Sequence, residues 1–502
     1  MVRLAISATS DRADRCIAAV LTQRPLQCTP SRTAASAPLH PSTLPHYLRL
    51  KPLSRPHDQH LLANRMKRST CAAPSTNREQ RGPTPVIHTL FDKSFFQALS
   101  LDESVWFDRF YKPVVCPIFY VETLADLALK ALKNRTPERE VQIIADKFPD
   151  HNGAPCTDHR TMIVGDLLGN AVPLDGRIPI SGGRAVRSAG TTGVVFDEAP
   201  EATAFNRWRN TEFSEIERTY AADLRQSLAE LDLSKVAETM QALGVNRETV
   251  PSLQAAKIAA EGLVIGHDRR AERLYLALQV LRIPVEAGRQ IVRRWEAMSR
   301  PPLPEFAPYA SHVLVVELFF HIATGAQLFP NRYRQSNRTD IAYLFYLPFC
   351  HAFVSSDKLH RDSAPLFLRS DQKFLWGPEV KADLKAMNAH YLELPETVRD
   401  TGILAFAPHP PVDRDYLTAQ LYDWYDPGWR DQKPIPGLPP EAQRNIVDRM
   451  NAMIKSTDVL PADTRLDDDN IRALSIPHLV RRKKGSWYQV PKGLSVQPKE
   501  EN

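Results

Sequence analysis

The stretch RTDIAYLFYLPFCHAFVSSDKLHRD, from Arg338 to Asp362, constrains the fold more than any other part of the chain. It sets Asp340 directly before an apolar run and Asp357 directly after that run turns back. The pattern predicts a helix of roughly 14 Å over 341–349, at 1.5 Å per residue, and a returning strand over 351–356. In an open parallel sheet, helix starts and strand ends share one rim, so we expect both aspartates there.

Two more acids fit the same rim. Asp92 follows the apolar, β-prone run 86–91, which predicts a buried strand. The segment ALSLDESVWFDRFYK then predicts a helix that PVVCP ends, and IFYVETLADLALKALKN predicts a second helix with Glu122 in its first turns. Asp126, one turn later, is an alternative to Glu122, and Asp340 could serve only as a helix cap.

Four carboxylates at one rim repel one another and need a cation. Two unit charges 4 Å apart cost about 1 kcal/mol in water and about 4 kcal/mol at an effective dielectric of 20. Oxygen ligands without His or Cys favour Mg²⁺ or Mn²⁺ over zinc. Such a cation activates water and neutralises charge on a phosphate, which suits phosphodiester hydrolysis. Three neighbours of these acids are predicted to support the site: Ser94, Asn337 and Ser356.

The segments FDKSFF, IFYVETL, NRTDIAYL and FVSSDKL resemble the four ordered acidic motifs of the PIN-domain ribonucleases. The resemblance implies a Rossmann-type three-layer α/β/α sandwich with a central, mainly parallel sheet. It also implies that Asp92, Glu122, Asp340 and Asp357 are catalytic and metal-binding residues of an endoribonuclease. The chain departs from the family in the long segment between the second and third acids.

The predicted organisation is an α/β domain split by a mostly helical insertion domain. Residues 1–85 contain ten prolines, and 13 Lys or Arg against 4 Asp or Glu. This composition predicts a disordered segment over 1–84 and leaves Met66 as a possible start. Helices are expected over 201–231, 252–264, 267–281, 284–298 and 307–326, and a final strand over 390–395. The remaining predicted units are 85–138 and 331–410 for the two halves of the PIN-like domain, 139–330 for the insertion, and 411–502 for an irregular C-terminal extension with one helix and a basic tail.

Composition indicates the cellular compartment of the protein and the kinds of partner it can bind. The six cysteines include no C-x-x-C pair, which suits a reducing cytoplasm. The longest apolar stretch, 312–323, contains Glu317 and falls short of the roughly 20 residues that span a bilayer, so no membrane is expected. Outside 1–85 the chain has 51 Lys or Arg against 54 Asp or Glu, so overall charge gives no argument for nucleic-acid binding.

Local signals outside the acids are weaker. The segment RRKKGSWYQV predicts phosphate contacts and base stacking through Arg481, Arg482, Lys483, Lys484 and Trp487, with a solvated tail as the alternative. Glu317 and His321 lie four residues apart on an apolar helix and could pair there. The Gly-rich region 165–195 contains no phosphate-loop motif, and we assign it no function.

The sequence therefore predicts a Mg²⁺- or Mn²⁺-dependent hydrolase of RNA, in which a water activated by the four acids attacks phosphorus in line and leaves a 5′-phosphate. The residues alone indicate a phosphoester, and the choice of RNA comes from the resemblance. The alternatives are a nuclease acting on DNA or on a nucleic-acid structure, and a catalytically inactive scaffold whose insertion domain binds a protein partner.

Overall fold

The structure is a computed structural model, and it describes residues 87–129, 136–180, 183–188, 190–196, 200–229, 233–329, 336–431, 440–460, 473–475 and 480–493. The predictions made for 1–84, including the start at Met66, lie outside the described residues.

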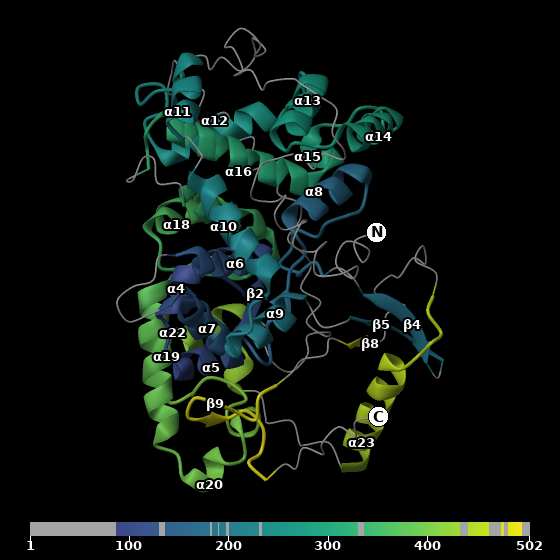
Figure 1. Cartoon of the computed structure of the whole chain (residues 1–502). Helices are drawn as coiled ribbons and strands as arrows, with labels where there is room; N and C mark the ends of the chain where they lie inside the picture. The colour runs from purple at the N-terminus through teal and green to yellow at the C-terminus, as the bar shows by residue number, and fades with distance from the viewer. Residues whose placement is uncertain are drawn as a thin grey trace.

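A five-stranded parallel sheet joins the two halves of the chain on either side of the helical block (Figure 1). The strand order is β3-β2-β1-β6-β7, and β6 pairs directly with β1. Strands β2 and β3 follow on one side of β1, and strands β6 and β7 follow on its other side. The order therefore reverses between β1 and β6, which is the position where open α/β sheets bind ligands. The strands are β1 (His88–Phe91), β2 (Lys112–Val115), β3 (Ala154–Pro155), β6 (Ala352–Ser355) and β7 (Lys373–Trp376).

Helical layers cover both faces of the sheet. Phe91 packs its ring against Phe96, Phe107 and Phe119, which belong to α4 (Lys93–Ala98), α5 (Leu101–Phe110) and α6 (Pro117–Leu124). Phe353, whose strand partner is Leu90, points to the opposite face because side chains alternate along a strand. There it meets the 3₁₀ helix η5 (Tyr343–Phe349) and α18 (Lys358–Ser363). The predicted α/β fold class is thus present, with a helix–sheet–helix arrangement.

Two predicted elements around the sheet are wrong. PVVCP was expected only to end a helix, but Lys112–Val115 form β2, where Val114 and Val115 are buried between β1 and β3. The strand expected over 390–395 does not form, because α19 (Gly377–Leu392) runs into it. The buried residues of α19 recur every three or four positions, which is the helical period, and Tyr391 continues that series: Val380, Leu384, Met387 and Tyr391.

The helical block lies between β3 and β6 in sequence. The expected helices over 252–264, 267–281, 284–298 and 307–326 are confirmed, but 201–231 is two helices. A capping box formed by Ser214 and Glu217 starts the second of them. Since β3 belongs to the sheet, the α/β unit extends past the expected boundary at 138 to at least Pro155. The block contains α8 (His159–Leu168), α9 (Pro200–Arg209), α10 (Glu215–Ala229), α11 (Leu233–Ala242), α12 (Leu253–Val264), α13 (Arg270–Val280), α14 (Val285–Ala297), α15 (Leu303–Phe306) and α16 (Pro308–Gly325).

Helix α16 connects this block to the sheet. It is buried around most of its circumference and packs against α11, α12, α8 and η5. Figure 1 shows α11 to α16 gathered at one end of the molecule. The hydrophobic core is continuous from the sheet into this block, since Phe91 and Leu314 belong to the same cluster of buried side chains.

The hairpin of the Gly-rich region lies beside the sheet, and the short C-terminal hairpin lies below it (Figure 1). The Gly-rich region contains the hairpin of β4 and β5, which β8 extends and α23 covers. The C-terminal extension was expected to contain one helix, but it contains both α22 and α23. These elements, with the remaining ones, are α7 (Pro137–Lys147), β4 (Arg184–Ser188), β5 (Thr191–Val195), α20 (Glu396–Arg399), α21 (Ile403–Phe406), α22 (Leu417–Tyr425), α23 (Pro440–Ile454), β8 (Ala473–Ser475), β9 (Lys483–Lys484), β10 (Trp487–Tyr488), α17 (Asn337–Ala342) and the 3₁₀ helices η4 (Ala125–Ala128), η6 (Ala364–Leu366) and η7 (Trp429–Asp431).

Candidate functional site

Asp92 and Asp357 lie where the strand order reverses. Asp92 directly follows β1 and caps α4, accepting a hydrogen bond of 2.9 Å from the Phe95 amide. Asp357 follows β6 by two residues and caps α18, accepting one of 2.7 Å from the Leu359 amide. Each acid satisfies a helix N-terminus, which favours a carboxylate there. The adjacent pairing of β1 with β6 therefore brings these two predicted acids to one edge of the sheet.

Two serine hydroxyls hold Asp92. Its Oδ2 accepts hydrogen bonds from Ser94 Oγ at 2.6 Å and from Ser355 Oγ at 2.8 Å. Ser94 was predicted to support the site, whereas Ser355 was not. The predicted Ser356 lies instead against Gly377 at the start of α19, where a Cβ on Gly377 would come 2.2 Å from the Ser356 Oγ. The supporting serine of β6 is therefore one residue earlier than the sequence suggested.

A buried histidine, His360, connects the acids. Its Nδ1 lies 2.8 Å from Ser355 Oγ and 3.6 Å from Asp92 Oδ2, and its Nε2 lies 2.6 Å from the backbone carbonyl of Asp340. The carbonyl can only accept, so Nε2 carries a proton. The hydroxyl of Ser355 donates to Asp92, so Nδ1 must donate as well. Both ring nitrogens are then protonated, and His360 is a cation.

The electrostatics agree with this assignment. Burial alone would lower the pKa of His360, but the contact with Asp92 and the charge of Asp340 raise that pKa to about 9. Burial alone would raise the pKa of Asp92, but its contacts with His360, Ser94 and the Phe95 amide hold it below the usual value. At neutral pH the site thus contains a buried imidazolium beside a buried carboxylate.

Asp340 and Asn337 lie in α17, whose first turn carries Asp340. Both residues are buried. The Asp340 carbonyl binds His360, and its carboxylate contributes to the raised pKa of that imidazole. Asp340 is thereby placed beside the Asp92 and Asp357 strand ends.

Glu122 reaches the site from the other face of the sheet and is half-buried. Its Oε2 accepts a hydrogen bond of 2.7 Å from the hydroxyl of Tyr343. Burial raises the pKa of Glu122, Lys93 opposes this rise, and the charges of Asp92 and Asp126 add to it. Lys93 forms an ion pair of 2.6 Å with Asp126 and donates to the Glu122 carbonyl at 3.1 Å. Asp126 is therefore paired with a lysine beside Glu122.

Replacing Tyr343 with Phe tests this contact. The change removes a hydrogen-bond donor from a carboxylate whose pKa is already raised, which is expected to cost about 1–3 kcal/mol of unfolding free energy. Urea unfolding at pH 7 in EDTA measures the loss. Tyr275→Phe, at a side chain that is 54% exposed, is the matched control. A loss equal to that of the control would contradict the role of this hydrogen bond.

The carboxylate oxygens of the predicted acids are ligands of the kind that a hard cation such as Mg²⁺ prefers. Among the described residues, however, no three His, Cys, Asp or Glu side chains lie close enough together to hold a metal ion. His360 and Lys93 also offset part of the negative charge of the cluster. Asp92 and the Asp340 carbonyl contact His360, and the charge of Asp92 acts on Glu122, so these acids lie near two internal cations that the sequence reasoning missed. A histidine three residues after Asp357, within the same helix, was the available signal.

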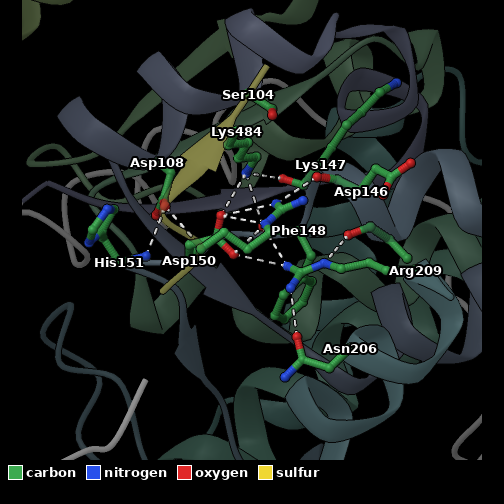
Figure 2. A network of polar contacts seen from close by, with 12 residues as sticks. Ser104, Asp108, Asp146, Lys147, Phe148, Asp150, His151, Asn206, Arg209 and Lys484 are labelled. Carbon is green, nitrogen blue, oxygen red and sulfur yellow. Dashed lines mark hydrogen bonds and ion pairs between the residues drawn. The ribbon is translucent and has the colours of Figure 1, made fainter. Parts of the chain in front are cut away.

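The basic C-terminal segment mostly makes internal contacts, and Figure 2 shows those of Lys484. Lys484 is 2% exposed, and its Nζ donates to the carbonyls of Lys147 and Phe148 at 2.9 and 3.0 Å. Arg481 forms an ion pair of 3.0 Å with Asp150. Trp487 is 1% exposed and donates its indole N–H to Asn388. These three residues therefore do not present the basic-aromatic surface that was expected.

Arg482 and Lys483 are exposed, so a role in phosphate contacts stays a prediction for these two alone. Glu317 was expected to pair with His321, but the structure pairs it with Arg338 at 2.5 Å.

No helix in the described part of the chain is both long and apolar enough to cross a membrane. Comparison with models of known protein families, with curated proteins and with solved structures found no match. What can be inferred about function therefore rests on the residues at the β1–β6 edge.

Proposed function

We propose that the protein is a PIN-like, divalent-metal-dependent nuclease that hydrolyses RNA at the β1–β6 edge. The observation that supports the proposal is that Asp92 and Asp357 follow the adjacent strands where the strand order reverses, while Ser355 and His360 connect Asp92 to the Asp357 amide and the Asp340 carbonyl. Acidic oxygens at a helix start or strand end of a parallel sheet suit a ligand site. The choice of RNA follows from the sequence resemblance.

In this proposal Asp92, Glu122, Asp340 and Asp357 would hold Mg²⁺ or Mn²⁺. The cation, when bound, would lower the pKa of water and neutralise charge developing on the phosphate. The protein's own residues position the acids.

Neighbouring residues fix three of the four acids. Ser94 and Ser355 fix Asp92, His360 fixes α17 through the Asp340 carbonyl, and Tyr343 fixes Glu122. Positioning of this kind matters because misplacing a reacting group by about 1 Å can cost about 100-fold in rate.

A second candidate is a catalytically inactive scaffold that binds a partner through its helical block. The internal cations favour it, because His360 and Lys93 supply positive charge that a metal would otherwise have to supply. Calorimetric titration with Mn²⁺ separates the two candidates, since a scaffold whose acids are neutralised by His360 and Lys93 needs no metal.

The decisive experiment is a cleavage assay with single-stranded RNA, single-stranded DNA, duplex and flap substrates in Mg²⁺, Mn²⁺ or EDTA. The wild type is expected to cleave RNA only with metal. A variant carrying Asp340→Asn and Asp357→Asn is expected to lose at least about 100-fold in rate, since it removes two of the four oxygen ligands. Asp362→Asn, at an exposed residue of α18, is the matched control.

Unchanged cleavage in the double variant would exclude this site as the source of activity. Cleavage of duplex or flap DNA in preference to RNA would reassign the substrate while keeping the mechanism. Absence of both cleavage and Mn²⁺ binding would favour the scaffold.

A further inference from the structure

The end of β7 carries an arginine beside a tryptophan. Trp376 is the last residue of β7, and its register partner on β6 is Ser355. The guanidinium carbon of Arg361, on α18, lies 5.1 Å from the centre of the Trp376 ring. At this range a guanidinium over an indole ring is held by a cation–π contact. We refer to Arg361 and Trp376 as the arginine–tryptophan pair.

The arginine–tryptophan pair lies beside the candidate acids. Register partners on parallel strands point to the same face of a sheet and are about 4.8 Å apart, so the Trp376 side chain lies on the same face as that of Ser355. The Ser355 hydroxyl donates to Asp92 and lies 2.8 Å from Nδ1 of His360, the residue before Arg361 on α18. The pair is therefore one strand away from the serine that holds Asp92.

The arginine–tryptophan pair has polar groups that the protein does not use. The Arg361 side chain is 49% exposed, and its Nε lies 3.4 Å from Asp362. Its two terminal nitrogens make no hydrogen bond with any described residue, and the same is true of the indole N–H of the half-buried Trp376. A nucleobase can stack on aromatic rings and on guanidinium planes, and such stacking accepts any base because every base has a π-face.

A lysine on α18 adds a positive charge next to this pair. Lys358 directly follows Asp357 and precedes Arg361 by three positions, a spacing that places two side chains on the same side of a helix. Lys358 is exposed, and it forms no ion pair within the part of the chain that the structure describes. An ammonium binds phosphate as a point charge. Groups for base stacking and for phosphate binding thus lie within one turn of α18.

We propose that Lys358, Arg361 and Trp376 form a subsite that binds one nucleotide of the RNA substrate beside the acids of the β1–β6 edge. The base stacks on the arginine–tryptophan pair, and Lys358 contacts an adjacent phosphate. This inference rests on the proposed function, and it adds residues that bind the substrate to the residues that would hold the metal.

The test measures, by fluorescence anisotropy, binding of a fluorescein-labelled single-stranded RNA 12-mer to the full chain in EDTA, so that no cleavage intervenes. A second probe is a 12-mer of abasic sugar–phosphate units. Arg361→Lys keeps the charge but removes the guanidinium plane. Lys358→Gln removes the charge of the lysine. Lys385→Gln, at an exposed residue two turns into α19, is the matched control for charge.

The two variants are expected to fail in different ways. Losing one stacked base weakens binding by about 5-fold or more, so Arg361→Lys should lose this factor for RNA and keep the wild-type affinity for the abasic chain. Losing one phosphate contact on a single strand reduces the salt slope by about 0.7, which is about 5-fold in affinity at 0.1 M salt. Lys358→Gln should therefore weaken binding of both probes about equally. Lys385→Gln should bind both probes as the wild type does.

The outcomes separate the subsite from the proposed function. Equal losses in Lys358→Gln and Lys385→Gln would overturn the subsite, and so would an Arg361→Lys variant without a selective loss of RNA binding. A wild type that binds no RNA would overturn it as well, and the cleavage assay would then decide on the nuclease separately. The expected losses in a wild type that never cleaves RNA would support the subsite and overturn the proposed function alone.

Discussion

Replacing His360 with Ala is expected to lower the free energy of unfolding by about 3–5 kcal/mol, the usual result of removing one partner from a buried ion pair. His360 is 1% exposed and Asp92 is 3% exposed, so water cannot replace the lost imidazolium beside the carboxylate. The substitution also removes the group that holds the Asp340 carbonyl. Guanidinium unfolding in EDTA at pH 7 measures the loss. His267→Ala, at an exposed histidine, is the control.

The pH dependence identifies the charge of His360 as the cause. The pKa of His360 is raised from its usual 6.5 to about 9 in the folded protein. A raised pKa contributes stability that is fully present below pH 6.5 and is lost as the pH rises through 9. The difference in unfolding free energy between wild type and His360→Ala should therefore shrink between pH 6.5 and 9. A difference that stays constant over this range would show that His360 acts by packing alone.

The positions of Asp92 and Asp357 were predictable because each of these two acids has a local signature. Asp92 follows β1 directly and Asp357 follows β6 by two residues, and helix caps favour aspartate at such positions. The meeting of the two required only that both strands belong to one parallel sheet. The sequence could not place β3, because two residues leave no readable pattern.

The contacts around the acids were harder to predict. Ser355 and Ser356 differ by one position, and a shift of one residue along a strand turns a side chain to the other face. The sequence alone does not decide which serine meets Asp92. His360 looked like one of many helical histidines, since its role depends on Asp92, which is 268 positions away in the chain.

The prediction of an exposed basic surface near the C-terminus was wrong in part for a related reason. Composition does not distinguish a solvated lysine from one whose ammonium is enclosed. Lys484 is buried because two backbone carbonyls and Asp150 receive its charge, and those groups belong to a segment more than 330 residues earlier. A run such as RRKK therefore predicts charge but not exposure.

Replacing Asp150 with Asn is expected to have an effect as large as that of His360→Ala. The charge removed here is that of a buried carboxylate rather than that of a buried imidazolium. The Asp150 side chain is 1% exposed and faces Arg209 at 3.1 Å, Arg481 at 3.0 Å and Lys484 at 3.7 Å (Figure 2). Asparagine keeps the shape of the side chain but leaves a buried ammonium and two guanidiniums without their carboxylate. We expect a loss of about 3–5 kcal/mol of unfolding free energy, measured by guanidinium unfolding at pH 7.

A double variant separates charge from packing in this network. Burial lowers the pKa of Lys484 to about 8, although Asp150 opposes this, so at pH 7 the lysine is still largely charged. Adding Lys484→Met to Asp150→Asn removes the stranded ammonium and is expected to recover part of the loss, as neighbouring charged residues couple in a double-mutant cycle. On the acid side, burial would raise the pKa of Asp150, but Lys484, Arg481 and Arg209 hold it below its usual value. The stability from this carboxylate is therefore present above the pKa of an unfolded aspartate, near 3.9, and is lost as the pH falls through the lower folded pKa. If the two substitutions simply added, the ion pair between Lys484 and Asp150 would not be what joins the C-terminal hairpin to the α/β unit.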